Sequence, residues 1–308
     1  MPALDLDMRV RLAAFEFLRQ QAELHDGVLS SRVLWQGFEF EGQRVQLKGI
    51  QGIFKPAILP SIPLSITTAP PEADRPRPYD DGFSADGSIL LYRYRGTDPR
   101  HHENVGLRHA MEARRPLVYF HGVVKGEYFA AWPVYVVADE PSALRFRVAV
   151  DDVHYMSEGL TVADDHAEAR RAYITVTTRQ RLHQRSFRVR VLQAYRERCA
   201  LCRLRHETLL DAAHIVADKD PLGEPVIANG LALCKLHHAA FDQDFLGIRP
   251  DRVVQVRRDI LQEEDGPMLV HGLQGFHGRP IWVPARSDQK PRTDLLEQRY
   301  QQFLAAQR

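Results

Sequence analysis

Three cysteines and one histidine form the strongest chemical pattern in the sequence. Cys199 and Cys202 are separated by two residues, and Cys234 and His237 repeat that spacing further along the chain. Each pair fits a tight turn that directs two side chains to one point, and two such pairs supply the four ligands of a tetrahedral structural zinc site. The alternative is a set of buried cysteines without a metal. Because the pattern uses all three cysteines of the chain, Zn²⁺ is the better interpretation.

A second group of polar residues lies between and beside these expected zinc ligands. His214 lies in the strand-like segment LLDAAHIV, Asn229 precedes a turn glycine, and His238 and Asp242 stand four residues apart where the sequence predicts the start of a helix. Side chains at i and i+4 share one helix face, so one imidazole and one carboxylate can hold a hard divalent ion such as Mg²⁺ or Mn²⁺. His237 projects about 100° away from His238 on a helix, so the two histidines can serve separate sites.

These residue types suit the hydrolysis of a phosphodiester bond. A neutral imidazole with a pKa near about 6.5, here that of His214, can take a proton from water, and a divalent ion can balance the charge on the phosphate and leaving oxygens. Taken alone, His214 would be interpreted as a core histidine and His238 as an idle neighbour of a zinc ligand. Their combination with Asn229 and Asp242 makes catalysis the better interpretation.

The segment 185–250 resembles the HNH endonucleases of the ββα-metal type, in the branch held together by a zinc knuckle. The motifs that carry this resemblance are CALC, LLDAAHIVADKD and VIANGLALCKLHHAAFD. The resemblance implies that His214 is the general base, that Asn229 orients it, and that His238 and Asp242 bind the catalytic ion. It also implies a structural Zn²⁺ on four ligands, which are Cys199, Cys202, Cys234 and His237.

One position departs from the pattern of this family. Many HNH enzymes place an acidic metal ligand immediately before the general base, whereas this chain has Ala213 at that position. Asp211 is close by in the sequence, but we do not expect it to be a ligand. The catalytic ion is therefore expected to depend on His238 and Asp242.

An arginine-rich segment precedes and overlaps the expected zinc knuckle. Between positions 169 and 205 the chain has eleven arginines and one acidic residue. Such a one-sided charge favours contact with a polyanion, and arginine suits bidentate contacts to phosphate. The alternative is a solvated helix face. We expect Arg181, Arg185 and Arg188 to contact the DNA backbone.

The first half of the chain shows a different pattern. Residues 5–25 have the periodicity of a helix, and residues 28–150 alternate short β-branched and aromatic runs with turn residues, which favours a largely antiparallel sheet or barrel. The proline-rich stretch 69–78 predicts a loop, and the acidic stretch 151–168 predicts a domain boundary.

Residues 75–150 resemble the SRA domain, a PUA-like barrel that flips a modified cytosine out of duplex DNA. The resemblance is carried by Tyr79-Asp80-Asp81, by YRYRG around Tyr94, and by a closing VYVV strand. It implies that Tyr79 and Tyr94 stack on the extruded base and that Asp81, or less favourably Asp80, accepts from the cytosine amine. The chain departs from the SRA pattern in a shorter acidic run and in GTDP after the second tyrosine. The alternative is that the tyrosines pack inside the domain, which we prefer for Tyr92.

Length and composition agree with two folded domains. The chain has 308 residues, a formal net charge of +1 and 44% hydrophobic residues, which is ordinary globular composition. We expect an α+β protein, with an SRA/PUA-like β-barrel domain at 1–165 and a zinc-stapled ββα-metal HNH domain at 166–308. The second domain includes a basic linker helix and a C-terminal extension, which we expect to pack on the ββα unit. No apolar run or signal layout indicates a membrane span or secretion, so a cytoplasmic location is expected.

The whole arrangement resembles bacterial restriction endonucleases with an SRA-like first half and an HNH second half. We therefore expect a modification-dependent, type IV-like endonuclease that recognises 5-methyl- or 5-hydroxymethylcytosine in double-stranded DNA by base flipping. A one-metal HNH mechanism would then hydrolyse the backbone, and a homodimer would cut both strands. The alternatives are an HNH nicking or repair nuclease without modification preference and a non-cleaving, zinc-stabilised DNA-binding protein.

Overall fold

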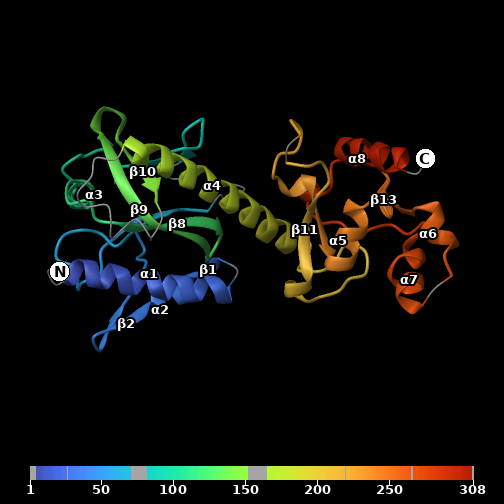
Figure 1. The fold of residues 1–308 in the computed structure, drawn as a ribbon, viewed down its shortest axis with the longest axis horizontal. Coiled ribbons are helices and arrows are strands. Elements are labelled where there is room, and N and C mark those ends of the chain that lie inside the picture. Colours follow the sequence, from blue (N-terminus) through green and yellow to red (C-terminus); the bar gives the residue numbers. More distant parts are fainter. Residues whose placement is uncertain are drawn as a thin grey trace. The chain divides into compact units, whose positions relative to one another are not determined.

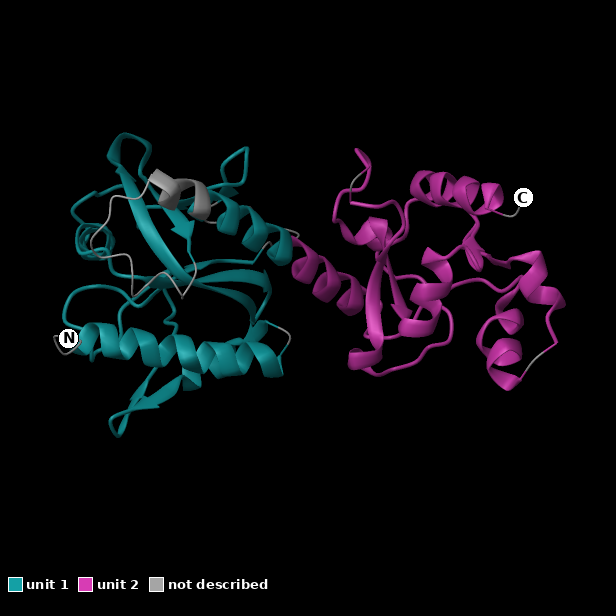
Figure 2. Ribbon diagram, in the orientation of Figure 1, with its two compact units in different colours: residues 1–182 teal, residues 183–308 magenta. Residues whose placement is uncertain are grey.

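The computed structural model describes residues 5–25, 27–70, 82–151, 165–218, 220–264 and 266–306, and in 165–170 it describes the backbone only. The chain divides into two compact units, residues 1–182 and 183–308 (Figure 2). The division falls inside the long helix α4 (Asp165–Ala194), whereas the sequence places the boundary at 165/166. The described residues form a mixed α+β fold (Figure 1).

The first unit opens with helix α1 (Leu6–Leu24). Asp5 caps it, because its carboxylate accepts a hydrogen bond of 2.8 Å from the Met8 N–H. The buried face of α1 packs against strand residues in one apolar cluster, and its apolar residues are Val10, Ala14, Phe15 and Leu18. The helix predicted for residues 5–25 is therefore confirmed.

The sheet of the first unit runs in the order β4-β5-β8-β9-β10-β7-β6, and β1 pairs with β9. Neighbouring strands are antiparallel except β5 and β8, which are parallel. The strands are β1 (Val28–Ser30), β4 (Ile53–Phe54), β5 (Ser65–Thr68), β6 (Gly82–Phe83), β7 (Leu90–Arg93), β8 (Leu117–Val124), β9 (Glu127–Glu140) and β10 (Arg145–Val150). The expected, largely antiparallel sheet is present.

The expected closed barrel is wrong for the described residues. A barrel requires its two edge strands to pair with each other. Here the edge strands β4 and β6 have two residues each and are not paired together in the described parts of the chain. The sheet is therefore open. The remaining elements of this unit are α2 (Ser31–Gln36), β2 (Phe38–Phe40), β3 (Gln43–Val45), α3 (His102–Glu112) and the 3-10 turn η1 (Pro141–Ala143).

The second unit is built around a β-hairpin followed by a helix. Strands β11 (Leu210–His214) and β12 (Gly230–Cys234) are antiparallel, with His214 opposite Gly230 and Leu210 opposite Cys234. Helix α5 (Lys235–Asp242) follows β12 directly. This is the ββα arrangement that the sequence predicts. The strands β11 and β12 and the helix α5 thus form one small structure.

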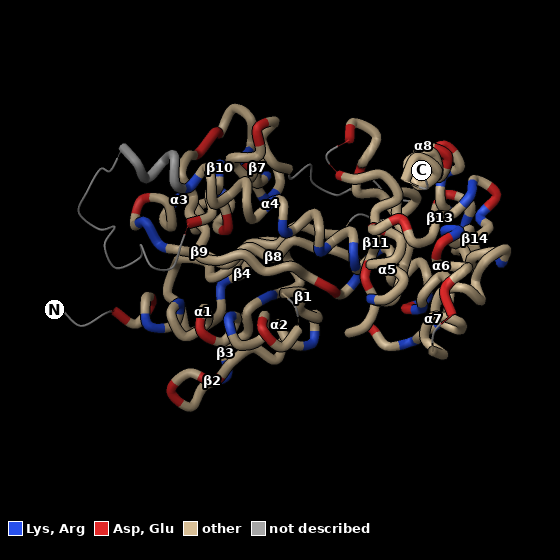
Figure 3. The backbone as a smooth tube through the Cα atoms, turned by 45° about the vertical axis from the view of Figure 1, so that its right-hand side comes forward, with Lys and Arg blue, Asp and Glu red and all other residues tan. Residues whose placement is uncertain are grey.

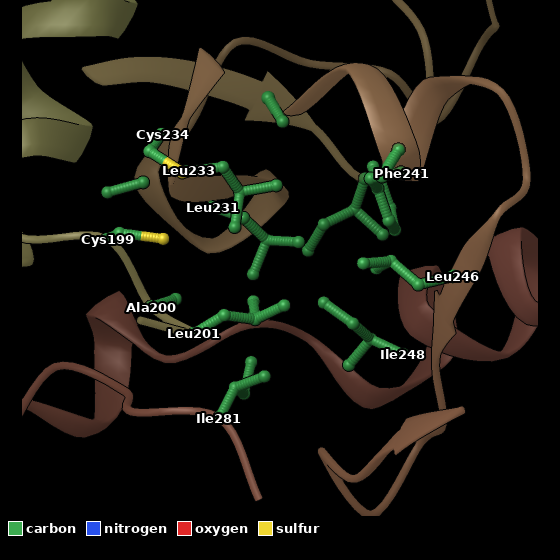
Figure 4. Close-up of a cluster of buried hydrophobic side chains, with 14 of the residues drawn as sticks. Cys199, Ala200, Leu201, Leu231, Leu233, Cys234, Phe241, Leu246, Ile248 and Ile281 are labelled. Atoms are coloured by element: carbon green, nitrogen blue, oxygen red, sulfur yellow. The ribbon is translucent and has the colours of Figure 1, made fainter. Parts of the chain in front are cut away.

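The C-terminal extension packs on this ββα structure. Ile281, Leu295 and Leu296 belong to the same buried cluster as Leu231 and Phe241 (Figure 4), which confirms the packing expected from the sequence. The further elements are β13 (Leu246–Ile248), β14 (Val254–Val256), α6 (Arg258–Gln262), α7 (Pro267–Gly272), α8 (Thr293–Ala305) and the 3-10 turns η3 (Glu207–Leu209), η4 (Ile227–Asn229), η5 (Gln274–Phe276) and η6 (Ser287–Gln289). None of the described helices is long and apolar enough to cross a membrane.

Candidate active site

The four expected zinc ligands converge on one point. The Sγ atoms of Cys199, Cys202 and Cys234 and a ring nitrogen of His237 all lie within 4.8 Å of one another. Cys202 Sγ and Cys234 Sγ are 3.9 Å apart, and His237 Nδ1 lies 3.4 Å and 3.1 Å from the Sγ atoms of Cys199 and Cys234. Zn–S bonds of about 2.3 Å place tetrahedral ligands about 3.8 Å apart. The cluster can therefore hold Zn²⁺.

Backbone hydrogen bonds shape the knuckle that presents the cysteines. The Cys199 N–H donates to the Leu204 carbonyl, and the Ala200 N–H donates to the Ala232 carbonyl of β12. The Gly272 carbonyl lies 2.8 Å from His237 Nε2, and a carbonyl can only accept. Nε2 therefore carries a hydrogen, so Nδ1, which faces the sulfur atoms, is the nitrogen that can bind a metal.

The electrostatics of the cluster also favour a cation. Hydrogen bonds from Cys202 and Cys234 lower the pKa of the Cys199 thiol. Burial lowers the pKa of His237, but hydrogen bonds to Cys199 and Cys234 outweigh burial and raise it to about 10. Negative charge on sulfur is thus stabilised only with positive charge beside it, which Zn²⁺ supplies.

His214, the expected general base, is the last residue of β11. Its ring stacks on Phe187 of α4, with the ring centroids 3.9 Å apart and the planes 13° from parallel. Burial lowers the pKa of His214 below 6.5, the charge on His238 lowers it further, and Asp218 and Asp242 act in the opposite direction. Nε2 is buried and has no hydrogen-bond partner among the described residues. The ring is therefore neutral near pH 7, and its Nε2 makes no hydrogen bond that holds the described part of the fold.

Asn229 closes the loop that follows His214. Its Oδ1 accepts from the Val216 N–H at 3.0 Å, and its Nδ2 donates to the carbonyls of Val216 at 3.0 Å and Glu224 at 3.1 Å. The backbone adds a bond from the Ile215 N–H to the Asn229 carbonyl. The Asn229 side chain is fully buried. It therefore fixes the backbone one and two residues after His214, as an orienting residue must.

His238 lies on a different face of α5 from His237 and contacts two carboxylates. His238 Nε2 is 3.2 Å from Asp242 Oδ2, and His238 Nδ1 is 3.4 Å from Asp211 Oδ2. Adjacent ligands of an octahedral ion with bonds of about 2.1 Å lie about 3.0 Å apart. The imidazole and the Asp242 carboxylate therefore fit a shared hard divalent ion.

Asp211 is part of this site, although the sequence does not predict it there. Burial raises its pKa, but hydrogen bonds from Lys235 and His238 outweigh burial and lower the pKa below its usual value. Asp211 and Ala213 stand two residues apart on β11, so both face the same side of the strand. Ala213 occupies the position of the usual acidic ligand. The alternation of side chains along the strand is the signal that could have identified Asp211 on the same face.

The three arginines expected at the DNA backbone differ in their surroundings. Arg181 is exposed and Arg185 is half-buried. Arg188 donates to the carbonyls of Glu207 at 3.1 Å and Leu210 at 3.0 Å. One nitrogen of its guanidinium thus holds the start of β11 against α4, and the contacts of the three arginines to phosphate stay predictions. Lys and Arg positions recur along α4 (Figure 3).

The expected base-binding residues fall into two groups. Tyr79 and Asp81 lie outside the described residues. Tyr94 is only 1% exposed, packs on Phe146 with centroids 4.6 Å apart, and donates its hydroxyl proton to Asp139. Burial and the bond to Asp139 raise its pKa to about 12. The ring of Tyr94 is thus largely enclosed, yet Tyr94 is also among the residues that line the cavity of the first unit, and its stacking on a base stays a prediction. Tyr92 is buried, as expected.

A cavity of about 530 Å³ lies in the first unit. Its wall combines basic, aromatic and amide side chains with loop glycine and proline. The lining residues include Lys48, Gln51, Thr67, Tyr92, Arg93 and Tyr128. The Lys48 Nζ lies 4.8 Å from the Tyr128 ring centroid.

Comparison with known proteins identifies one part of the chain. A family model described as HNH endonuclease matches residues 199–249, which confirms the HNH resemblance of the zinc knuckle and the ββα structure. No curated protein matches the sequence. Two solved structures are similar at a distance. A modification-dependent TagI restriction endonuclease shares 17% identity over 79% of this chain and 82% of its own, with a TM-score of 0.27.

The second solved structure is the type IV phosphorothioation-dependent restriction endonuclease ScoMcrA. It shares 18% identity over 61% of this chain and 54% of its own, with a TM-score of 0.25. The chain thus spans about half the length of that enzyme.

Proposed function

We propose that this protein, a DNA endonuclease with an HNH domain at residues 199–249, hydrolyses the backbone of double-stranded DNA in response to a modified cytosine. The observation that carries the cleavage half of the proposal is the arrangement at the end of the hairpin. A neutral, half-buried imidazole at His214 is held by Asn229 and lies within electrostatic range of His238 and Asp242. These groups supply the base and the ion ligands that phosphodiester hydrolysis requires.

Each side chain of the site has its own role in the proposed reaction. His214 takes the proton of the attacking water. Asn229 keeps that ring in place through the loop that follows it. His238 and Asp242 hold Mg²⁺ or Mn²⁺, which when bound balances charge on the phosphate and leaving oxygens. Zn²⁺ on the Cys3His cluster keeps β12, α5 and the knuckle together.

For recognition, we propose that the protein binds 5-methyl- or 5-hydroxymethylcytosine after the base has been extruded from the duplex. The cavity of about 530 Å³ in the first unit supports it, because binding sites for small ligands measure roughly 300–1,000 Å³. Aromatic walls can offset the stacking energy that an extruded base loses. Tyr79 and Asp81 remain the proposed stacking and amine-accepting residues, and Arg181 and Arg185 the proposed backbone contacts.

Two HNH units are needed to cut both strands of a duplex at one place. We therefore propose that two copies of the chain act together as a homodimer. Strand cleavage by one copy alone would leave a nick.

Digestion of matched plasmids tests both halves of the proposal. The plasmids carry cytosine, 5-methylcytosine, 5-hydroxymethylcytosine or its glucosylated form, and each is incubated with wild type and His214→Ala in Mg²⁺ or Mn²⁺. Wild type should cut at least one modified plasmid faster than the plain one, and His214→Ala should bind DNA and keep its zinc but cut about 100- to 10,000-fold more slowly. Unchanged cutting by His214→Ala removes this histidine as the base.

A second function is favoured by one observation. Because Tyr94 is only 1% exposed and packs on Phe146, one of the two expected stacking residues offers little ring surface to an extruded base. If all four plasmids are cut equally in the same experiment, the protein is instead an HNH nuclease that nicks or repairs DNA without modification preference.

A further inference from the structure

His238 lies between two carboxylates that come from different elements. Its Nε2 faces Asp242 at 3.2 Å, one helical turn along α5, and its Nδ1 faces Asp211 at 3.4 Å, on strand β11. An imidazole that binds an ion through one nitrogen can donate a hydrogen bond only through the other. The two carboxylates therefore cannot play the same role toward this ring.

The surroundings of Asp211 already contain a cation. Lys235 Nζ lies 2.9 Å from Asp211 Oδ1 and 2.8 Å from Asp211 Oδ2, and Arg188 Nε lies 3.9 Å from Oδ1. A divalent ion bound to this carboxylate would sit next to the ammonium group and be repelled by it. The carboxylate of Asp242 is 55% exposed, and in the described structure its partner is His238. The Asp242 side of the ring is thus the side that suits the ion.

We propose that Asp211 is a positioning residue that accepts the Nδ1–H of His238 and so directs the Nε2 lone pair toward Asp242 and the catalytic ion. A carboxylate behind a metal-binding histidine fixes its tautomer and its ring orientation. The inference rests on the role in ion binding that the proposed function gives to His238.

This arrangement also explains how the chain functions with alanine before the general base. The position usually occupied by an acidic ligand is Ala213, and the carboxylate two residues earlier on the same strand face, at Asp211, acts on the ion through His238 instead of by direct contact. Strand β11 thus contributes both the base, at its last residue, and the orienting group for the ion ligand on α5.

The test uses the full-length, zinc-loaded protein and two measurements that need no DNA. The first is Mn²⁺ affinity, from the electron paramagnetic resonance signal of free Mn²⁺. The second is the tautomer of His238 in the Mn²⁺-free protein, from its imidazole ¹⁵N chemical shifts, assigned with His238→Gln. The variants are Asp211→Ala, Asp211→Asn and the control Lys235→Met, which removes the neighbouring cation but leaves the Asp211–His238 contact. Zinc content and the melting transition verify that each variant is folded.

The positioning role makes distinct predictions for the three variants. Wild type should show His238 protonated at Nδ1. Asp211→Ala should lose this preference and bind Mn²⁺ about 10- to 100-fold more weakly. Asp211→Asn should recover most of the affinity, because its side-chain oxygen can still accept the Nδ1–H. Lys235→Met should bind Mn²⁺ at least as well as wild type.

Other outcomes overturn the inference, and they can be told apart from a failure of the proposed function. Equal losses of Mn²⁺ affinity in Asp211→Asn and Asp211→Ala would make Asp211 a direct ligand. An Nε2-protonated His238 in wild type, or unchanged affinity in Asp211→Ala, would remove the positioning role while leaving the ion site intact. A wild type that binds no Mn²⁺, or binds it unchanged in Asp242→Asn, would remove the proposed ion site itself.

Discussion

Asn229 offers a sharp test of how the general base is held. Its side chain is fully buried and makes three hydrogen bonds, one from the Val216 N–H and two to the carbonyls of Val216 and Glu224. Asn229→Ala leaves one buried N–H and two carbonyls without this partner. An unsatisfied buried group costs about 1–3 kcal/mol, so the three together cost on the order of 3–9 kcal/mol if the loop does not move.

The loop after His214 is expected to move rather than accept that cost. A domain is stable by only about 5–15 kcal/mol, and releasing the backbone at Val216 lets these groups reach water. The ring of His214, two residues earlier, then loses its fixed position. We expect the cleavage rate of Asn229→Ala to fall about 100-fold or more, since misplacement by about 1 Å can cost that much. The melting temperature should also fall.

The assay is plasmid cleavage under single-turnover conditions, together with thermal melting and zinc content. Gln274→Ala is the matched control, because Gln274 Nε2 donates to the carbonyls of Ile260 at 2.8 Å and Glu263 at 2.9 Å in the same unit. It should retain the wild-type cleavage rate. Asn229→Asp should behave like Asn229→Ala, since a carboxylate oxygen would face the carbonyls of Val216 and Glu224. Wild-type cleavage by Asn229→Ala would refute the reasoning.

Three further predictions concern pH, zinc and the N-terminal core. Because burial lowers the pKa of His214 below 6.5, the acid limb of kcat/KM should fall below pH 6.5; a limb above that value would contradict the assigned base. Because the pKa of His214 is lower in the folded protein, the unfolded chain binds a proton at this residue at a higher pH. The contribution of His214 to stability should therefore decrease as pH falls below about 6.5, which denaturant unfolding measures. Cys199→Ser or strong chelation should release zinc and abolish the melting transition of the second unit, and an intact transition in calorimetry would exclude a structural role for the metal. Tyr94→Leu, which removes the aromatic ring, should leave the ratio of modified to plain plasmid cleavage unchanged in a protein that still melts cooperatively, because the ring is buried; a changed ratio would support Tyr94 as a stacking residue.

The zinc cluster and the ββα structure could be predicted from sequence because their geometry is local. The cysteine pairs lie within single turns, and β11, β12 and α5 are joined in one short stretch of chain. Spacing along a helix alone places His238 and Asp242 on one face and His237 on another. The distances between their side-chain atoms agree with that expectation.

Asp211 could not be found in this way, because its contact with His238 joins residues 27 positions apart. Strand alternation places Asp211 on the face of Ala213, but only the packing of α5 against β11 brings His238 to that face. Arg188 illustrates the same limit. Its charge is evident from the sequence, yet only the structure shows that the carbonyls of Glu207 and Leu210 occupy its guanidinium.

By itself the sequence determined the chemistry that short-range spacing controls: which residues can bind Zn²⁺, which imidazole can act as a base, and which pair can hold a hard ion. The tertiary structure decided which side chains are available for that chemistry. Tyr94 has the residue type expected of a base slot, but only the structure shows that its ring packs against Phe146 and that its hydroxyl donates to Asp139. Availability depends on burial by distant segments, and no local pattern in a single chain encodes it.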